Sequence, residues 1–374
     1  MVKQILIAPN AFKHSLSAVE VANIIESELS RAGFVCTVAP IADGGDGTID
    51  VIKYYFPDST FVECNAHDPL MRKIRSKWLL LDEKTAVVEL AKVSGISLLK
   101  KEELSPNLAN TFGTGELILS ALDKGCRKII LSVGGSATVD AGIGILSALG
   151  VGIFDKNKQK IIGGNQNLLF VDSVDFSYVD KRACECTFVI LCDVKNSLSG
   201  EKGILPFAVQ KGVRAGDLLA LERGVNNFAN VVANYTSKDF RFDLMTGAAG
   251  GVPFSMKSFF FAELLPGAEY LYKLICLEEK IQCADLVITG EGSLDEQTLM
   301  GKGVFELVKL SKKFKKKIIV ICGRYDSKIN WALYGIDFVV QIKPQGVSEE
   351  ESIVKAKDFL RKAVKNMTEM FIKY

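Results

Sequence analysis

The sequence predicts an α/β protein in which a parallel-sheet domain is built from both termini and a second domain is inserted between them. Short apolar runs, glycine-containing turns and helical periodicity alternate at both ends of the chain, which is the pattern of a parallel sheet. The middle mixes this pattern with the alternation of antiparallel strands. The length of 374 residues suits two domains. We expect residues 1–60 with 285–374 to form the first domain and residues 61–284 the inserted one.

The first 56 residues predict two strand–helix units. Residues 4–8 form a short apolar run that suits a buried strand, and residues 17–20 form a capping box that begins a helix. A second strand at 34–38 leads into a turn of glycines and aspartates, and a helix follows from Thr48. Loops that follow parallel strands share one edge of the sheet, where ligands bind. Lys13 and the turn at 43–48 are therefore expected to face one cleft.

The remaining elements follow from the same signals. Residues 73–81 and 85–90 alternate like antiparallel strands. Further strands are expected at 128–133, 187–191, 285–289, 318–322 and 337–342, and helices at 114–124 and 304–312 and from the capping box at 348–351.

The composition limits which kinds of binding partner, catalysis and metal site the chain can support. The 46 basic and 44 acidic residues leave a formal charge of +2, which gives no footprint for nucleic acid or an anionic membrane. The chain has only two histidines, His14 and His67, which is too few for a histidine-rich metal site and leaves few candidates for a histidine base. Its nine cysteines are scattered without a C-x-x-C pair, which fits reduced thiols rather than disulfides or zinc. No secretory signal is evident, and we expect a cytoplasmic protein.

Five turns that follow predicted strands combine glycine with acids, hydroxyls or lysine. They are centred on Lys13, 43–48, 134–140, 193–196 and 290–295. Glycine lets backbone amides approach an anion, so Gly134, Gly135, Ser136 and Thr138 are candidates to cradle phosphate. The turn is neither a Walker A motif nor a G-x-G-x-x-G fingerprint. Tight packing of strand against helix is the structural alternative for any one such turn.

Acidic side chains are expected at the ends of the strands. They are Asp43, Asp46, Asp140, Asp193, Glu291 and Asp295. Carboxylates without histidine suit Mg²⁺, which takes one or two of them together with phosphate oxygens, and one acid could orient or deprotonate a hydroxyl nucleophile. The alternative is that about half only cap helices or turns. Lys13, Lys211 and Lys302 are candidate counter-charges to phosphate.

At these motifs the sequence resembles the bacterial glycerate kinase family, the type unrelated to P-loop and ribokinase-like kinases. The matching stretches in the first half of the chain are Ile7-Ala8-Pro9, Phe12-Lys13, Ser15-Leu16-Ser17-Ala18, Ala42-Asp43-Gly44-Gly45-Asp46-Gly47-Thr48 and Gly134-Gly135-Ser136-Ala137-Thr138 with Asp140. Those in the second half are Cys192-Asp193-Val194 with Asn196, Gln210-Lys211-Gly212, Gly247-Ala248-Ala249-Gly250-Gly251 and 285–292 with Asp295, Gln297-Thr298 and Gly301-Lys302. The chain departs from the family pattern at several positions, among them Asn10, His14 and Ser293.

The resemblance implies ATP-dependent phosphorylation of D-glycerate to 2-phosphoglycerate by a Rossmann-like domain with an inserted α/β domain and an active site in the cleft between them. The alternatives are 3-phosphoglycerate as the product, or a related small hydroxy acid as the substrate.

Joined with the motifs, the resemblance implies a role for each candidate residue. Catalytic candidates are Asp193, Asp295 and Lys13; phosphate-binding candidates are Gly134, Gly135, Ser136, Thr138 and Lys302; substrate-binding candidates are Ser15, Ser17 and Asn196; and Mg²⁺ candidates are Asp43, Asp46 and Glu291.

Two other function classes stay open. An NAD-type dehydrogenase would need a dinucleotide fingerprint and a proton-transferring histidine, and both are missing. A non-catalytic sensor of sugar acids would not need so many carboxylates beside phosphate-type turns. We expect ATP and D-glycerate as partners, no nucleic acid or membrane, and a monomer or homodimer.

Overall fold

The computed structural model describes residues 4–201, 203–299 and 303–372. The chain divides into two compact units. The first unit is Met1–Asp43, Asp50–Tyr55 and Gly267–Tyr374, and the second is Gly44–Ile49 and Phe56–Pro266. The first unit thus takes in residues 267–284, which the sequence patterns placed in the insertion, because Ala268, Tyr272 and Ile281 pack in its core.

The first unit holds a five-stranded, fully parallel sheet in the order β13-β12-β11-β1-β2. Its strands are β1 (Gln4–Ile7), β2 (Val35–Val38), β11 (Leu286–Leu294), β12 (Lys317–Tyr325) and β13 (Phe338–Gln341). Its helices are α1 (Ala18–Arg31), α10 (Gly267–Leu274), α11 (Leu277–Cys283), α12 (Glu296–Leu299), α13 (Gly303–Lys313), α14 (Glu349–Val354) and α15 (Ala356–Ile372), and α2 (Thr48–Tyr55) runs from the second unit into the first.

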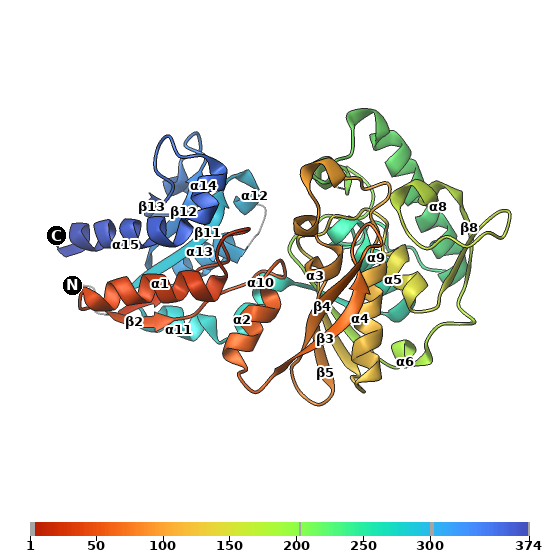
Figure 1. The fold of residues 1–374 in the computed structure, drawn as a ribbon, viewed down its shortest axis with the longest axis horizontal. Coiled ribbons are helices and arrows are strands. Elements are labelled where there is room, and N and C mark those ends of the chain that lie inside the picture. The colour runs from red at the N-terminus through yellow and green to blue at the C-terminus, as the bar shows by residue number, and fades with distance from the viewer. Residues whose placement is uncertain (1–3, 202, 300–302, 373–374) are drawn as a thin grey trace. The chain divides into compact units, whose positions relative to one another are not determined.

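Helices cover both faces of this sheet, as expected for a doubly wound α/β domain. Ile5 and Ile7 of β1 pack with α1 and α15, which lie alongside each other (Figure 1), while Leu6 packs with α10, α11 and α13. This alternation places successive side chains of a strand on opposite faces. The strand order reverses direction between β1 and β11, and such a switch point is where open α/β sheets bind ligands at the carboxyl ends of their strands.

The capping box at the start of α1 is confirmed. Ser17 Oγ accepts a hydrogen bond from the Glu20 amide at 3.2 Å and donates to Glu20 Oε2 at 3.0 Å, and the Ser17 amide also donates to that oxygen. The hydroxyl of Ser17, a predicted substrate-binding residue, is thus engaged in the cap of α1.

Replacing Ser17 by alanine is expected to cost about 1 kcal/mol of stability, because the cap acceptor is lost. Urea unfolding measures this loss, and Ser17→Asp, which restores an N-cap acceptor, should recover it. A purely structural Ser17 predicts an unchanged KM for D-glycerate in both variants. A KM that rises in both would instead place Ser17 at the substrate.

The prediction of a turn at residues 290–295 is wrong, because β11 continues as a strand to Leu294. Glu291, Ser293 and Leu294 pair with Cys322, Arg324 and Tyr325 of β12. Two glycines lie between these pairs, and a Cβ on Gly323 would stand 2.6 Å from the Gly292 carbonyl oxygen. The facing glycines therefore let the two strands remain close, and Asp295 follows directly at the strand end.

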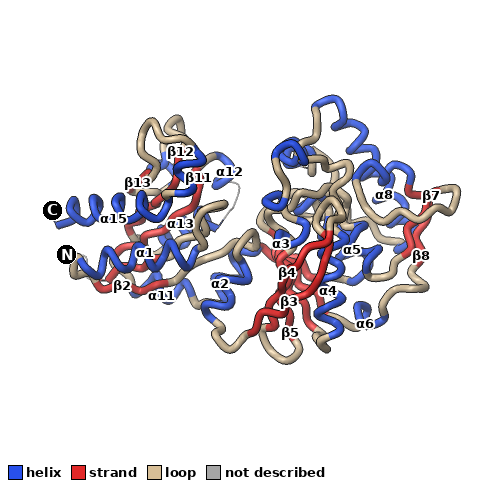
Figure 2. Tube along the Cα trace, viewed as in Figure 1, coloured by secondary structure: helices blue, strands red, loops and turns tan. Residues whose placement is uncertain are grey.

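The second unit holds a six-stranded mixed sheet in the order β10-β9-β6-β5-β4-β3 and a separate pair β7-β8. Its strands are β3 (Thr60–His67), β4 (Lys73–Leu80), β5 (Thr85–Glu89), β6 (Lys128–Ser132), β7 (Gly152–Asp155), β8 (Val171–Asp175), β9 (Thr187–Cys192) and β10 (Glu263–Pro266). Its helices are α3 (Ala91–Ser94), α4 (Phe112–Asp123), α5 (Ile143–Ala148), α6 (Lys181–Cys184), α7 (Leu205–Ala208), α8 (Leu218–Thr236) and α9 (Val252–Phe260). The antiparallel character expected for 73–81 and 85–90 is confirmed, because β4 pairs antiparallel with both β3 and β5, and these three strands lie side by side in Figure 2. The strands β5, β6, β9 and β10 pair in parallel.

The core of the second unit surrounds this sheet. Trp78, Phe188, Phe228 and Phe254 are its largest fully buried side chains. All nine cysteines of the chain are free thiols. Within the described parts of the chain, no helix combines the length and the hydrophobicity that a bilayer crossing needs.

Candidate active site

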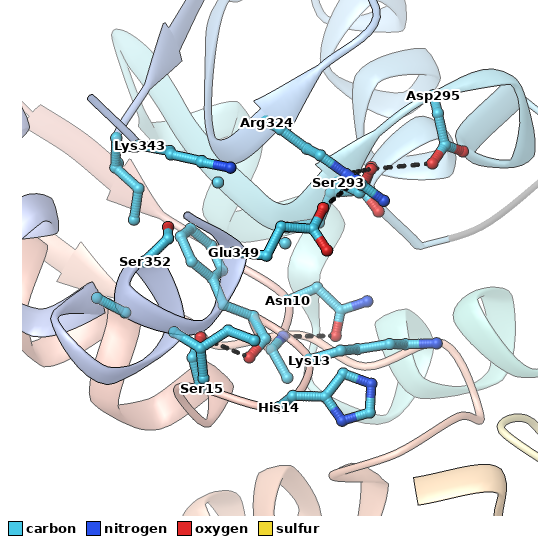
Figure 3. A pocket seen from close by; sticks show the side chains of 18 of the residues that line it. Asn10, Lys13, His14, Ser15, Ser293, Asp295, Arg324, Lys343, Glu349 and Ser352 are labelled. Carbon is cyan, nitrogen blue, oxygen red and sulfur yellow. Dashed lines mark hydrogen bonds and ion pairs between the residues drawn. The ribbon is translucent and has the colours of Figure 1, made fainter. Parts of the chain in front are cut away.

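The first unit has a cavity of about 330 Å³ at the carboxyl ends of its parallel strands. Its walls come from the loop after β1, from the ends of β11 and β12, and from α14 (Figure 3). The predicted site residues that line it are Lys13, Ser15, Asp43, Glu291 and Asp295. The expectation that loops after these strands gather candidate residues at one edge is therefore met within this unit.

Asp43 and Glu291 are each held by hydrogen-bond donors. Asp43 Oδ2 accepts hydrogen bonds at 3.3 Å from Asn10 Nδ2 and from the amide of Gly303, which is the first residue of α13. Glu291 Oε1 accepts from Thr298 Oγ1 at 2.8 Å. Both side chains accept hydrogen bonds as carboxylates do, so both are suited to ligate a cation.

Asp295 is oriented by two hydrogen bonds. Ser293 Oγ donates to its Oδ2 at 3.0 Å, and the Gln297 amide donates to its Oδ1 at 2.9 Å. Ser293 Oγ in turn accepts from Arg324 Nε at 3.2 Å. The chain of donors from Arg324 through Ser293 fixes one face of the carboxylate that lines the cavity (Figure 3).

The loop after β1 places Lys13, His14 and Ser15 on the cavity wall (Figure 3). Ser15 Oγ donates to the Phe12 carbonyl at 3.0 Å, which fixes this tight turn. His14 has a φ of +65°, unusual for a residue with a side chain. The predicted phosphate-binding Lys302 lies outside the described residues.

The predicted Mg²⁺ ligands do not all fall in one unit. Asp43 and Glu291 line the same cavity, whereas Asp46 belongs to the second unit. Over residues 4–201, 203–299 and 303–372, no group of three or more His, Cys, Asp or Glu side chains could hold a metal by itself. Because Mg²⁺ takes one or two carboxylates plus phosphate oxygens, the pair Asp43 and Glu291 fits such an ion.

In the second unit, the glycine turn after β6 packs against residues 44–46. The Gly134 amide donates to the Gly44 carbonyl at 2.9 Å, and a Cβ on Gly134 would lie 2.6 Å from the Gly45 Cα. Gly135 has a φ of +77°, and a Cβ there would meet the carboxylate of Asp46 at 2.9 Å. These glycines are therefore required for the close approach of two loops, as the structural alternative foresaw.

The backbone of this turn is already partly used within the protein. The Ala137 amide donates to the Ser94 carbonyl at 2.9 Å, and the Gly135 carbonyl accepts from the Ile96 amide at 2.9 Å. Together with the Gly134 amide, two of the five amides of residues 134–138 thus donate to backbone carbonyls, and Gly134 is the one of these two that was a phosphate-binding candidate. The helix that follows this turn, α5, starts only at Ile143.

Replacing Gly134 by alanine is expected to destabilise the protein by about 1–3 kcal/mol, because the added methyl group overpacks the contact with Gly45. Urea unfolding would measure the loss, and kcat would show whether the turn must keep its shape. Gly216→Ala is the matched control, since a Cβ at Gly216 meets nothing within 4 Å. An unchanged stability for Gly134→Ala would contradict the tight packing.

Asp140 lies just before α5, the helix that follows the glycine turn. Its carboxylate accepts from the Gly142 and Gly144 amides at 3.1 and 3.3 Å and from the Thr111 amide and hydroxyl at 2.9 Å. Asp140 is fully buried, and burial raises the pKa of its carboxyl group, although these hydrogen bonds act to lower it. Asp140 therefore joins the starts of α4 and α5.

Lys211 is a buried cation beneath the glycine turn. Its Nζ donates to Ser136 Oγ at 2.6 Å and to the Thr138 carbonyl at 2.7 Å. Burial lowers its pKa from the ordinary 10.5 to about 8, although the charges of Asp193 and Asp140 oppose that shift. The lysine thus ties together two predicted site residues, Ser136 and Thr138, within the field of the Asp193 carboxylate.

Asp193 and Asn196 follow β9. Asp193 Oδ2 lies 3.0 Å from where a Cβ on Gly134 would be, so this carboxylate borders the glycine turn. Asn196 Nδ2 donates to the Ser197 and Gly203 carbonyls at 3.3 Å. The buried Oδ1 of Asn196 and the buried Oγ1 of Thr138 have no hydrogen-bond partner among the described residues.

Sequence reasoning missed four charged residues at these sites. Glu89, at the end of β5, is 1% exposed and accepts from the Gly47 and Ile49 amides at 3.0 and 3.1 Å. Arg324, Lys343 and Glu349 line the cavity of the first unit. The signal available for Glu89 and Arg324 was their place near the end of a strand.

The chain is similar to known proteins over nearly its whole length. A sequence model of the glycerate kinase family matches residues 5–372. Glycerate kinases of Halalkalibacterium halodurans and Bacillus subtilis are 34% and 35% identical to the chain, each over 97% of it and over 97% and 96% of their own lengths. Glycerate 2-kinase of Escherichia coli K12 is 35% identical over 97% of both chains.

A solved structure is similar over the same length. It is a crystal structure of a protein from Salmonella typhimurium LT2, provisionally identified as glycerate kinase 2, with a TM-score of 0.79 and 31% identity over 100% of this chain and 99% of that one. Both the sequence and the fold therefore agree from end to end. The protein belongs to the glycerate kinase family and is a kinase.

Proposed function

We propose that this kinase transfers the γ-phosphoryl group of ATP to D-glycerate and releases 2-phosphoglycerate and ADP. The observation that carries the proposal is full-length similarity to glycerate kinases, one of which is named glycerate 2-kinase. The cavity of the first unit supports it, since it gathers Lys13, Asp295 and the pair Asp43 and Glu291 at the edge where parallel sheets bind ligands. The free thiols fit a cytoplasmic enzyme.

In the proposed reaction the C2 hydroxyl oxygen of glycerate attacks the γ-phosphorus, and the bond from that phosphorus to the β,γ-bridging oxygen breaks. Asp295 or Asp193 accepts the hydroxyl proton and orients the nucleophile. Lys13 offsets the negative charge of the phosphoryl group during transfer. Catalysis of this kind is mostly positional and electrostatic.

Asp43 and Glu291 would hold Mg²⁺ together with phosphate oxygens. The ion, when bound, neutralises charge that develops on the β- and γ-phosphate oxygens. Asp46 is not assigned to this Mg²⁺ pair, because its carboxylate packs against Gly135 in the second unit. There Lys211 holds Ser136 and Thr138, and Asn196 and Thr138 offer buried polar atoms to a ligand.

A coupled assay of ADP release with D-glycerate tests the proposal, and NMR of the product separates the 2- from the 3-phosphate. We expect ADP release that depends on both D-glycerate and Mg²⁺, with 2-phosphoglycerate as product. Release with a different hydroxy acid but not with D-glycerate would move the enzyme to the alternative substrate class. A protein that binds D-glycerate without releasing ADP would be a sensor.

A further inference from the structure

We propose that Arg324 binds the anionic group of the ligand in the cavity of the first unit, and that Glu349 holds this arginine until the ligand displaces it. The inference rests on the proposed function, in which an anionic substrate enters this cavity. It identifies an affinity-determining arginine and a competing carboxylate, neither of which belongs to the glycine-rich motifs.

The position of Arg324 is fixed by the end of β12. Its neighbour in the sheet is Ser293 of β11, to whose hydroxyl Arg324 Nε donates at 3.2 Å. The single proton of that hydroxyl goes to Asp295 Oδ2, so the Ser293 oxygen is left to accept from the guanidinium. Arg324 is therefore aimed into the cavity beside a candidate catalytic carboxylate (Figure 3).

Glu349, the first residue of α14, occupies another edge of the guanidinium. Arg324 Nη1 lies 2.5 Å from Glu349 Oε1, and the two side chains are 62% and 66% exposed. An ion pair this exposed adds little to stability. A carboxylate or phosphate group of a ligand offers the same kind of acceptor and can bind the guanidinium bidentately, so it can replace Glu349 at little cost.

The charge of the cavity explains why such an arginine is needed. Asp43, Glu291 and Asp295 line the cavity and would repel an anionic ligand, while Lys13 and Lys343 line it with positive charge (Figure 3). Arg324 adds a cation whose acidic partner is itself exposed and replaceable. The carboxylate of D-glycerate and a phosphate of ATP share the chemistry that this arginine recognises, and the experiment separates the two sources.

Three variants test the inference: Glu349→Gln, Arg324→Gln and Arg324→Lys. For each, KM is measured for D-glycerate and for ATP, and Kd is measured calorimetrically for D-glycerate and for a non-hydrolysable ATP analogue. Glu349→Gln, which removes the competing charge, should lower one of the two KM values about three-fold. Arg324→Gln should raise the same KM about 10- to 100-fold, and Arg324→Lys should recover part of the loss.

A matched ion pair controls for the change of charge. Arg75 and Glu63 join β4 to β3 in the second unit at 2.5 Å with side chains 76% and 56% exposed. Glu63→Gln and Arg75→Gln should leave both KM values unchanged. Which substrate responds to the cavity variants identifies the source of the anion.

Each result decides the inference. It is overturned if Arg324→Gln binds both probes as the wild type does, or if Glu349→Gln weakens binding instead of strengthening it. If the wild type releases no ADP with D-glycerate, the proposed function fails, and the Kd values alone decide. In that case weaker binding of either probe by Arg324→Gln supports the inference, and equal binding, or no binding of either probe by the wild type, rejects it.

Discussion

Asp295→Asn is expected to lower kcat about 10²- to 10⁴-fold, the usual contribution of a positioned general base. The asparagine keeps the size of the side chain, and its oxygen can still accept from the Gln297 amide. It cannot take the proton of the glycerate hydroxyl. The rate of ADP release at saturating substrates measures this loss.

The same substitution should cost only about 1 kcal/mol of stability, because one hydrogen bond, that from Ser293, is rearranged. Asp326→Asn is the matched control. Asp326 accepts from the Lys328 amide at 2.9 Å with the same two-residue spacing, but it follows β12 and does not line the cavity. Equal losses of kcat in both variants would show that charge removal alone, rather than proton transfer, lowers the rate.

Asp193→Asn decides between the two candidate bases. Asp193 borders the glycine turn and contributes negative charge to the surroundings of Lys211. If Asp295 takes the proton, Asp193→Asn should lower kcat by a smaller factor, as expected for a residue that positions others. The reverse order would assign the base to Asp193, and wild-type turnover in both variants would remove both from the mechanism.

Much of the fold follows from local signals. Short apolar runs located the strands at both termini, although β11 and β12 extend beyond them, and the Ser17 capping box marked the start of α1 within one residue. The parallel sheet built from both termini follows because each of these strands is followed by a turn and a helix. Local sequence contains these signals in full, so a single chain was sufficient to predict them.

The features that sequence reasoning missed depend on contacts between distant segments. The extension of β11 to Leu294 requires Gly323, a residue about thirty positions later, to admit the strand. The local sequence does not distinguish Glu89 from a surface acid, because its hydrogen bonds from the Gly47 and Ile49 amides come from a segment about forty residues earlier. Arg324 joins the candidate site only because β12 pairs with β11. No periodicity along the chain encodes such pairings.

Lys211→Met is expected to change stability at pH 7 by no more than about 3 kcal/mol while it lowers kcat/KM about 100-fold. The pKa of Lys211 falls from 10.5 to about 8, so the charged form costs about 3 kcal/mol in the folded protein. Methionine removes this cost. It also leaves the Ser136 hydroxyl and the Thr138 carbonyl without their donor, which costs about 1–3 kcal/mol for each group.

These opposing contributions nearly cancel, so stability alone does not explain a lysine at this position. Activity should fall because Ser136 and Thr138 lose the cation that positions them, and a displacement of about 1 Å at an active site can lower the rate 100-fold. Thermal or urea unfolding and steady-state kinetics on the same preparation measure both effects. A loss of stability above about 4 kcal/mol with normal kinetics would make Lys211 a structural residue.

The dependence of stability on pH provides a second test of the buried charge. Below pH 8 Lys211 is protonated in both the folded and the unfolded chain, so its contribution is constant. Between pH 8 and 10.5 the folded protein releases the proton before the unfolded chain does, and unfolding must then take up a proton. The stability of the wild type should therefore rise relative to Lys211→Met over this range, by up to about 3 kcal/mol. Because the two proteins share every other titrating group, a constant difference between them would mean that Lys211 titrates normally and that the turn above it is open to water.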